Sequence, residues 1–135
     1  MKLLKTSFIT LVLLNLFLVC TAAQGTNDLP PQLVKALQTG NSITLGNYFS
    51  DRIELAIQDK ESIYSKSQAT QIISKFFREY PPTNFKIKHA GGKPGARYVI
   101  GTLYTKSKTF RINFLLKSPN GKPFIHQLHI ETDGH

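Results

Sequence analysis

Histidine and carboxylate side chains are the groups of this sequence that could perform acid–base chemistry or bind a metal ion. Three of the four histidines are His89, His126 and His129. His126 and His129 differ by an odd number of positions in a segment that alternates like a strand. They should therefore point to opposite faces and should not bind one metal ion together. The sequence also contains no nucleophile elbow, phosphate-binding loop or Cys/His arrangement. It thus predicts no metal site and no cofactor.

Acid–base catalysis of the isomerase or dehydratase type requires a carboxylate or a histidine inside an apolar pocket. Among the acids that follow residue 23, only Glu54 and Glu131 lie within predicted strands. Glu54 occupies the face opposite the apolar residues of its strand, which predicts a solvated side chain. His89 and His126 each share a predicted strand face with large apolar residues, which indicates a packed or rim position. An enzyme of this type is therefore an alternative hypothesis and not the main one.

The tyrosines indicate binding more clearly than the acids do. A tyrosine ring is large and amphipathic, so a hydroxyl at the mouth of a pocket can orient a ligand, although packing is the commoner role. We expect these rings at the ends of elements and on the sheet. They are Tyr48, Tyr64, Tyr80, Tyr98 and Tyr104.

Positive charge is concentrated in the second half of the chain. The formal charge of the whole chain is +9, of which two charges belong to Lys2 and Lys5. Residues 24–82 carry six Lys/Arg and six acids, whereas residues 83–135 carry nine Lys/Arg and two acids. The favoured interpretation is a solvated sheet face whose lysines prevent aggregation, and the alternative is a basic face that attracts an anionic envelope surface. The residues predicted for this face are Lys86, Lys88, Arg97, Arg111 and Lys117.

The first 23 residues have the pattern of a signal peptide. A positive start precedes a run from Leu11 to Val19 that is apolar apart from Asn15, and small residues follow at Thr21–Ala23. We expect cleavage after Ala23, and so a secreted or periplasmic domain of residues 24–135. Lipid anchoring at Cys20 is a less favoured alternative, because Val19 stands where a small residue is expected. Removal of the leader removes the only cysteine, so the domain should form no internal disulfide. Export also makes nucleic acid an unexpected partner.

One apolar stripe predicts a central helix within Tyr64–Pro82. Its residues recur at helical spacing, and they must lie against a large apolar surface. Ser65 and Gln68 form a capping box at its start, and Pro81 and Pro82 end it. The stripe consists of Ala69, Ile72, Ile73, Phe76, Phe77 and Tyr80.

Two shorter helices are predicted before the central helix. Asp28 should cap a helix that ends at Thr39, with Gly40 as its terminator. Asn41 should cap the second, with Ile43, Leu45, Tyr48 and Phe49 as its apolar anchors.

Strand patterns surround and follow the central helix. Ile53–Ile57 alternates as a half-buried strand, and a brief return strand follows at Ile63 and Tyr64. After Pro82, four strand-like runs begin at Phe85, Arg97, Phe110 and Phe124. Glycines between Gly91 and Gly95 should end the first run, and the last run should place Phe124, His126, Leu128 and Ile130 on one face. This order predicts an α+β fold in which three N-terminal helices pack on a curved, mainly antiparallel sheet.

Several motifs resemble an uncharacterised family of small exported bacterial proteins with a nuclear transport factor 2-like (cystatin-like) cone. The resemblance implies a cone-shaped domain over nearly all of residues 24–135. It implies little about function, because that fold supports isomerases, dehydratases, adaptors and binding modules. The motifs are YSKSQA at 64–69, FF at 76–77, H-x-G at 89–91, YVIGTL at 98–103, QLHIE at 127–131 and AQG at 23–25.

The favoured hypothesis is a noncatalytic binding module that holds a small apolar or amphipathic ligand, or a protein partner, between the central helix and the sheet. A homodimer paired through the sheets is possible, although repulsion between two basic faces opposes it. The residues predicted to contact the ligand are Tyr48, Tyr64, Phe77, His89, Tyr98 and His126.

Overall fold

The computed structural model of the chain describes residues 29–134. The predicted leader, with Cys20 and the cleavage position after Ala23, lies outside the described residues and stays a prediction. Within residues 29–134, no helix is long and apolar enough to cross a membrane. The elements are α2 (Pro31–Thr39), α3 (Ser42–Asn47), β1 (Phe49–Ile57), β2 (Lys60–Ser65), α4 (Lys66–Glu79), β3 (Pro82–Lys93), β4 (Ala96–Thr105), β5 (Thr109–Lys117) and β6 (Phe124–Thr132).

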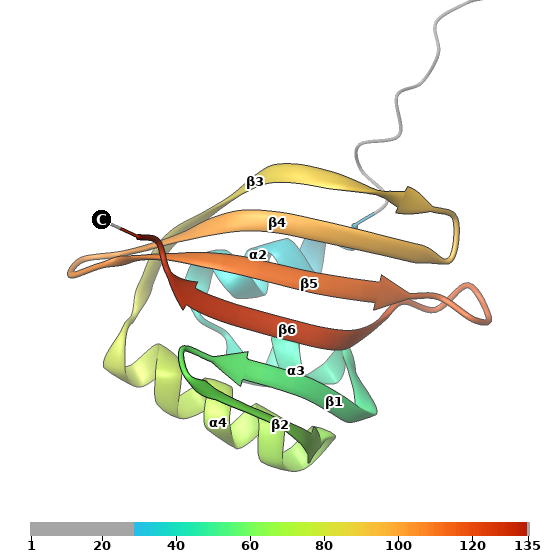
Figure 1. Ribbon diagram of the computed structural model, residues 1–135, viewed down its shortest axis with the longest axis horizontal. Helices are drawn as coiled ribbons and strands as arrows, with labels where there is room; N and C mark the ends of the chain where they lie inside the picture. Colours follow the sequence, from blue (N-terminus) through green and yellow to red (C-terminus); the bar gives the residue numbers. More distant parts are fainter. Residues whose placement is uncertain (1–28, 135) are drawn as a thin grey trace, which may run out of the picture.

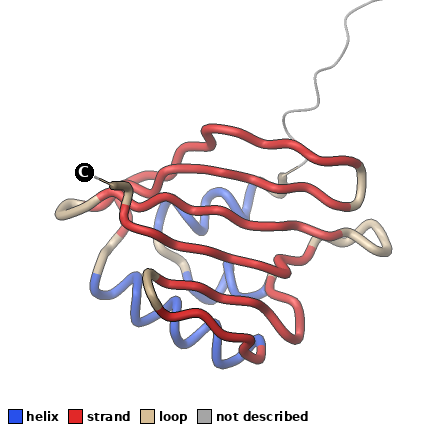
Figure 2. The backbone as a smooth tube through the Cα atoms, in the orientation of Figure 1, coloured by secondary structure: helices blue, strands red, loops and turns tan. Residues whose placement is uncertain are grey.

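The strands form one six-stranded sheet in the order β2-β1-β6-β5-β4-β3 (Figure 1). Neighbouring strands are antiparallel except for β1 and β6, which run parallel. The sheet is curved, and the three helices all lie behind one of its faces (Figure 2). This arrangement confirms the predicted α+β class. The face that carries the helices is called the inner face below, and the opposite face is called the outer face.

Helix α4 lies on the inner face as its apolar stripe predicted. The Ser65 hydroxyl accepts a hydrogen bond from the Gln68 N–H at 3.2 Å, and the Gln68 side chain accepts one from the Ser65 N–H at 3.2 Å. Phe76 and Phe77 are both 5% exposed within the core. The Phe76 ring meets Phe110 of β5 edge-on, with 5.0 Å between ring centroids. The capping box and the buried stripe are therefore confirmed.

The two preceding helices match their predictions in part. Helix α2 begins at Pro31 with Pro30 as its N-cap residue, so it starts later than predicted, and the expected cap Asp28 lies outside the described residues. Proline has no backbone N–H, so Pro31 in the first turn needs no hydrogen-bond partner there. This helix can therefore begin without a capping side chain. In α3 the Asn41 side chain accepts from the Thr44 N–H at 3.0 Å, as predicted. Ile43, however, is 72% exposed and does not anchor that helix.

Two β-bulges change the predicted faces of the strands. In β3, Ile87 pairs with Gly101 and His89 pairs with Ile100, so Lys88 is an extra residue. In β6, Ile125 pairs with Leu116 and Gln127 pairs with Leu115, so His126 is an extra residue. One extra residue moves every later side chain to the other face. The predicted common face of Phe124, His126, Leu128 and Ile130 is therefore wrong, and Ile125 is buried with Leu128 and Ile130 instead.

The glycines after His89 do not end β3, contrary to the prediction. Gly91 pairs with Tyr98 and Gly92 pairs with Arg97, so the strand continues to Lys93. A Cβ atom on Gly91 would lie 2.5 Å from the Tyr98 hydroxyl, which shows that the tyrosine ring covers this glycine. A glycine beneath an aromatic ring on the neighbouring strand is compatible with regular pairing.

Replacement of the N-cap serine should destabilise the protein measurably. We expect Ser65→Ala to lower the free energy of unfolding by about 1 kcal/mol, because the Gln68 N–H loses the hydroxyl that accepts its hydrogen bond. The matched substitution Ser67→Ala, at an exposed position of the same helix, should change it by less than about 0.5 kcal/mol. Urea unfolding followed by circular dichroism measures both values. Equal effects of the two substitutions would contradict the role of the capping box.

Candidate functional site

The residues predicted to line one pocket lie in separate parts of the molecule. Phe77 is buried in the core, and Tyr48 and Tyr64 are half-buried against it. His89 and Tyr98 lie on the outer face, where the His89 Nε2 atom is 3.2 Å from the Tyr98 hydroxyl. The structure therefore does not bring these residues together in one cavity. The bulge at Lys88 explains the displacement of His89, because it reverses the face on which that histidine lies.

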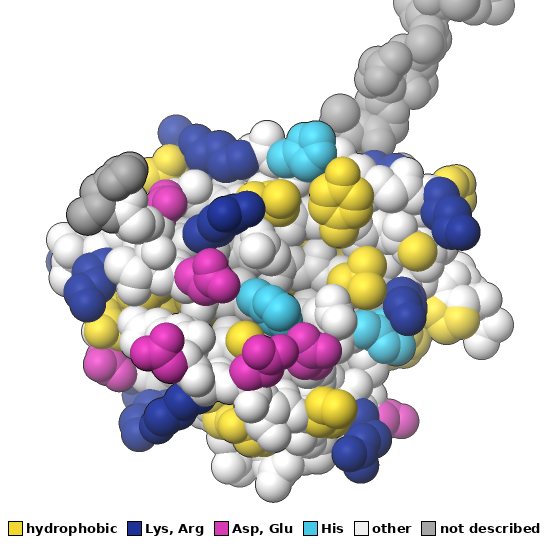
Figure 3. All heavy atoms as spheres, in the orientation of Figure 1, with side chains coloured by type: hydrophobic (Ala, Val, Ile, Leu, Met, Phe, Trp, Pro, Cys, Tyr) yellow, Lys and Arg dark blue, Asp and Glu magenta, His cyan; other side chains and the backbone are white. Residues whose placement is uncertain are grey.

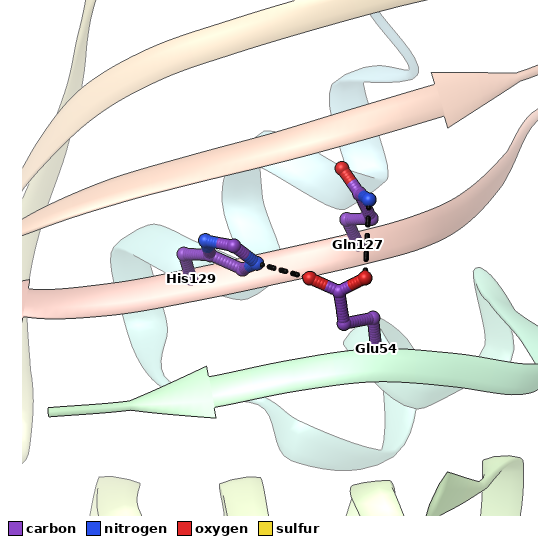
Figure 4. A network of polar contacts seen from close by, with 3 residues as sticks. All are labelled: Glu54, Gln127 and His129. Carbon is purple, nitrogen blue, oxygen red and sulfur yellow. Dashed lines mark hydrogen bonds and ion pairs between the residues drawn. The ribbon is translucent and has the colours of Figure 1, made fainter. Parts of the chain in front are cut away.

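Another side-chain network occupies the outer face over β1 and β6 (Figure 4). The Nε2 atom of His129 is 2.9 Å from Oε1 of Glu54, and the Gln127 amide donates to Oε2 of Glu54 at 3.2 Å. The side chains of His129 and Glu54 are only 31% and 30% exposed. The hydrogen bond from His129 lowers the pKa of Glu54, while burial acts in the opposite direction. Glu54 is thus a bonded and half-buried carboxylate, not the solvated side chain that was predicted.

Sequence reasoning missed this network because its members are far apart in the chain. Glu54 and His129 are separated by 75 positions and meet only because β1 pairs with β6. The alternation of Gln127 and His129 with the apolar residues of β6 indicates an outward direction for both side chains. No local pattern, however, indicates which strand lies beside β6.

A shallow hollow of about 260 Å³ adjoins the network on the outer face. Asn113 and His129, which pair across β5 and β6, both contribute to its wall. The Oδ1 atom of Asn113 is buried and has no hydrogen-bond partner among the described residues. The side chains that line the hollow come from Tyr98, Val99, Ile100, Asn113, Phe114, Leu115, Gln127 and His129.

A larger open groove lies between α4 and the sheet, at the end of the molecule where β1 turns into β2. We call it the α4–β1 groove, and its volume is about 460 Å³. Of the residues predicted to contact a ligand, Tyr64 lines it. The groove is lined by Leu55, Ile57, Gln58, Asp59, Lys60, Tyr64, Ile72, Lys75, Phe76 and Glu79.

The five predicted basic residues are spread over three strands. Lys86 of β3 and Arg111 of β5 both pair with Thr102, and Arg111 also lies opposite the acidic Glu131. Lys117 is at the other end of β5, about 20 Å from Arg111 at a rise of roughly 3.4 Å per residue. Figure 3 shows the outer face, on which Lys and Arg side chains are scattered with acidic and histidine side chains among them. Lys88 is the bulge residue in the middle of β3, and Arg97 pairs with Gly92 near the hairpin between β3 and β4. The five residues are therefore spread over the sheet, and a basic sheet face that binds an anionic surface stays a prediction.

Comparison with known proteins agrees with the architecture. The family model described as Domain of unknown function (DUF4783) matches residues 31–131. The chain belongs to the DUF4783 family. A DUF4783 protein of Bacteroides ovatus is 30% identical, with a TM-score of 0.75 over 79% of this chain and 97% of that chain. A DUF4783 protein of Bacteroides uniformis is also 30% identical, with a TM-score of 0.75 over 80% of this chain and 100% of that chain.

More distant structures show the fold alone. An NTF2-like (nuclear transport factor 2-like) protein of unknown function from Cytophaga hutchinsonii is 14% identical to this DUF4783 chain. Its TM-score is 0.54 over 76% of this chain and 84% of that chain. No curated protein matches the sequence. The NTF2-like fold implied by the motifs is thus confirmed for this DUF4783 protein, and the family description assigns no activity.

The pKa of His126 tests the position of this bulge residue of β6, which is partly buried and feels the charge of Lys117. Burial of this histidine lowers its pKa below the usual 6.5, and the positive charge of Lys117 lowers it further. We expect Lys117→Gln to raise the pKa part of the way back, because burial remains. Lys35→Gln, on α2, should leave the pKa unchanged. NMR titration of the imidazole protons measures these shifts.

Stability should follow the same titration. As the pH falls through about 6.5, the unfolded chain takes up a proton at His126 that the folded chain resists, so the free energy of unfolding should decrease. His126→Gln should reduce this pH dependence. An unchanged pKa of His126 in Lys117→Gln would contradict the predicted effect of the Lys117 charge. An unchanged pH dependence of the free energy of unfolding in His126→Gln would contradict the predicted contribution of His126.

Proposed function

We propose that this DUF4783 protein is an exported, noncatalytic binding module that holds a small amphipathic ligand in the α4–β1 groove. The observation that supports the proposal is an open groove of about 460 Å³ with an apolar floor and a charged rim. Volumes of roughly 300–1,000 Å³ are typical of small-molecule sites. The groove also lies between the central helix and the sheet, where the sequence predicted a site.

The floor and the rim favour an amphipathic ligand. Ile57, Ile72 and Phe76 supply apolar surface, and Phe76 is 5% exposed at the bottom. Lys60 and Lys75 bring positive charge to the rim. The apolar part of a ligand would lie over the isoleucines, and an anionic group would lie near the lysines.

An adjoining hollow extends the binding surface along α4. It has a volume of about 410 Å³ and shares Tyr64, Ile72 and Lys75 with the α4–β1 groove. Arg78 lies at its far side and adds a third cation to Lys60 and Lys75. This arrangement supports an anionic head group directed toward Lys75 and Arg78.

The positions of the acids support a noncatalytic role. Asp59 and Glu79 line the groove but are exposed, whereas a catalytic base needs a water-poor position beside the substrate. The bonded pair of Glu54 and His129 lies on the outer face, on the other side of the sheet from the groove. Thus neither the pair of Asp59 and Glu79 nor the pair of Glu54 and His129 is both buried and able to reach the apolar floor of the groove.

Export is supported by the leader pattern of residues 1–23. We expect the protein recovered from the periplasm or the medium of a bacterial host to begin at Gln24. Intact-mass measurement and N-terminal sequencing test this. A product that still carries residues 1–23, or one with a lipid on Cys20, would contradict cleavage after Ala23.

A ligand retained by the protein would identify the site. We expect native mass spectrometry of the protein purified from its bacterial host to show a noncovalent adduct that denaturation releases. Ile72→Ser should lose the adduct, because it replaces apolar floor with a hydroxyl. Ile43→Ser is the matched control, since Ile43 is exposed outside the groove.

A fluorescent probe makes the test independent of a retained molecule. Anilinonaphthalene sulfonate combines an apolar ring system with an anionic group, as the groove requires. We expect saturable binding to the wild type and to Ile43→Ser, and at least about fivefold weaker binding to Ile72→Ser and Lys75→Ala. Equal binding by all four proteins, or no saturable binding, would overturn the proposed function.

A further inference from the structure

We propose that Glu54, Glu61 and His129 form a binding site for a divalent transition-metal ion of the Zn²⁺ class on the outer face of the sheet. One ligand atom from each of these three side chains lies within 4.8 Å of the other two. The site is separate from the α4–β1 groove, because it lies on the opposite face. Sequence reasoning predicted no metal site, since the three residues come from three different strands.

The register of the sheet brings the three side chains together around one small residue. Ala56 of β1 pairs with Glu61 of β2 on one side and with His129 of β6 on the other. Glu54 is two residues before Ala56 and so lies on the same face. The methyl group of Ala56, 8% exposed, forms the floor between the three side chains. A larger residue at this position would fill the space that the ion requires.

The set of ligand atoms favours Zn²⁺ over Ca²⁺ or Mg²⁺. An imidazole nitrogen with two carboxylate oxygens suits Zn²⁺, whereas Ca²⁺ and Mg²⁺ prefer oxygen ligands alone. Ligand atoms about 2.0–2.2 Å from a tetrahedral zinc ion lie roughly 3.3 Å apart. His129 Nε2 and Glu54 Oε1 are already 2.9 Å apart, and an oxygen of the exposed Glu61 side chain completes a cluster whose three ligand atoms are no more than 4.8 Å apart. Three protein ligands leave the fourth position open to water or to a small ligand.

Two neighbouring amides provide the outer partners that metal ligands normally have. The Gln127 amide donates to Oε2 of Glu54, which leaves Oε1 directed toward His129 (Figure 4). Asn113 pairs with His129 across the sheet and lines the same hollow, and its buried Oδ1 has no partner among the described residues. A metal-bound histidine usually donates its second ring N–H to such an oxygen. With a metal ion on His129 Nε2, the Nδ1 atom would carry the proton, and the cross-strand neighbour Asn113 offers an acceptor oxygen without a partner among the described residues.

The test is a zinc titration of metal-free protein, purified from a bacterial host through a tag without histidine. We expect saturable 1:1 binding of Zn²⁺ by calorimetry, and a higher unfolding temperature with Zn²⁺ than with a chelator. Glu54→Gln, Glu61→Gln and His129→Gln should each weaken binding at least about tenfold, and Asn113→Ala should weaken it by about tenfold. Circular dichroism in the presence of chelator verifies that each variant folds.

Matched controls separate this site from nonspecific metal binding. Glu131→Gln removes another acid of β6, and His126→Gln removes another histidine of β6. Both should bind Zn²⁺ like the wild type, and Ca²⁺ should not compete at equal concentration. The proposal is overturned if the wild type shows no saturable binding or if the controls weaken binding as much as the three ligand variants do. It is also overturned if His129→Gln keeps the wild-type affinity.

Discussion

The packing of α4 against the inner face of the sheet is the interaction on which the rest of this structure depends. Phe76 and Tyr80 of the helix region meet Phe110 of β5 at centroid distances of 5.0 and 4.9 Å, mostly edge-on. Aromatic pairs of this kind add to the apolar surface that they bury. With the only cysteine in the predicted leader, burial of this kind must hold the domain together. The same packing sets the distance between α4 and β1, and so the width of the groove.

Strand β1 contributes side chains to both proposed sites. Its inner face contributes Leu55 and Ile57 to the α4–β1 groove, and its outer face carries Glu54. β1 is the point where the parallel pairing with β6 meets the antiparallel pairing with β2. Because successive side chains alternate between faces, one strand can serve two sites without connecting them. Evidence against one of the two proposed sites would therefore leave the other proposal unaffected.

The β-bulges decide which chemistry the outer face carries. Without the extra residue at His126, Ile125 would lie on the face of the sheet opposite to Leu128 and Ile130. The bulge at Lys88 likewise places His89 beside Tyr98 on the outer face. Bulges bend a strand and redirect its side chains, and they are frequent beside functional sites. In this protein they leave the inner face apolar and place polar and titratable side chains on the outer face.

The sequence by itself determined the elements whose signals are local. The spacing of the α4 stripe, the Ser65 and Gln68 capping box and the Asn41 cap each predicted what the structure shows, because helix periodicity and capping act over a few residues. The motifs at Tyr64–Ala69 and Tyr98–Leu103 indicated the family fold for the same reason. Only the tertiary structure decided the faces of β3 and β6, because a bulge depends on pairing with another strand. It alone brought Glu54 to His129 and Gln127, since the pairing of β1 with β6 joins segments more than 70 positions apart and leaves no local pattern.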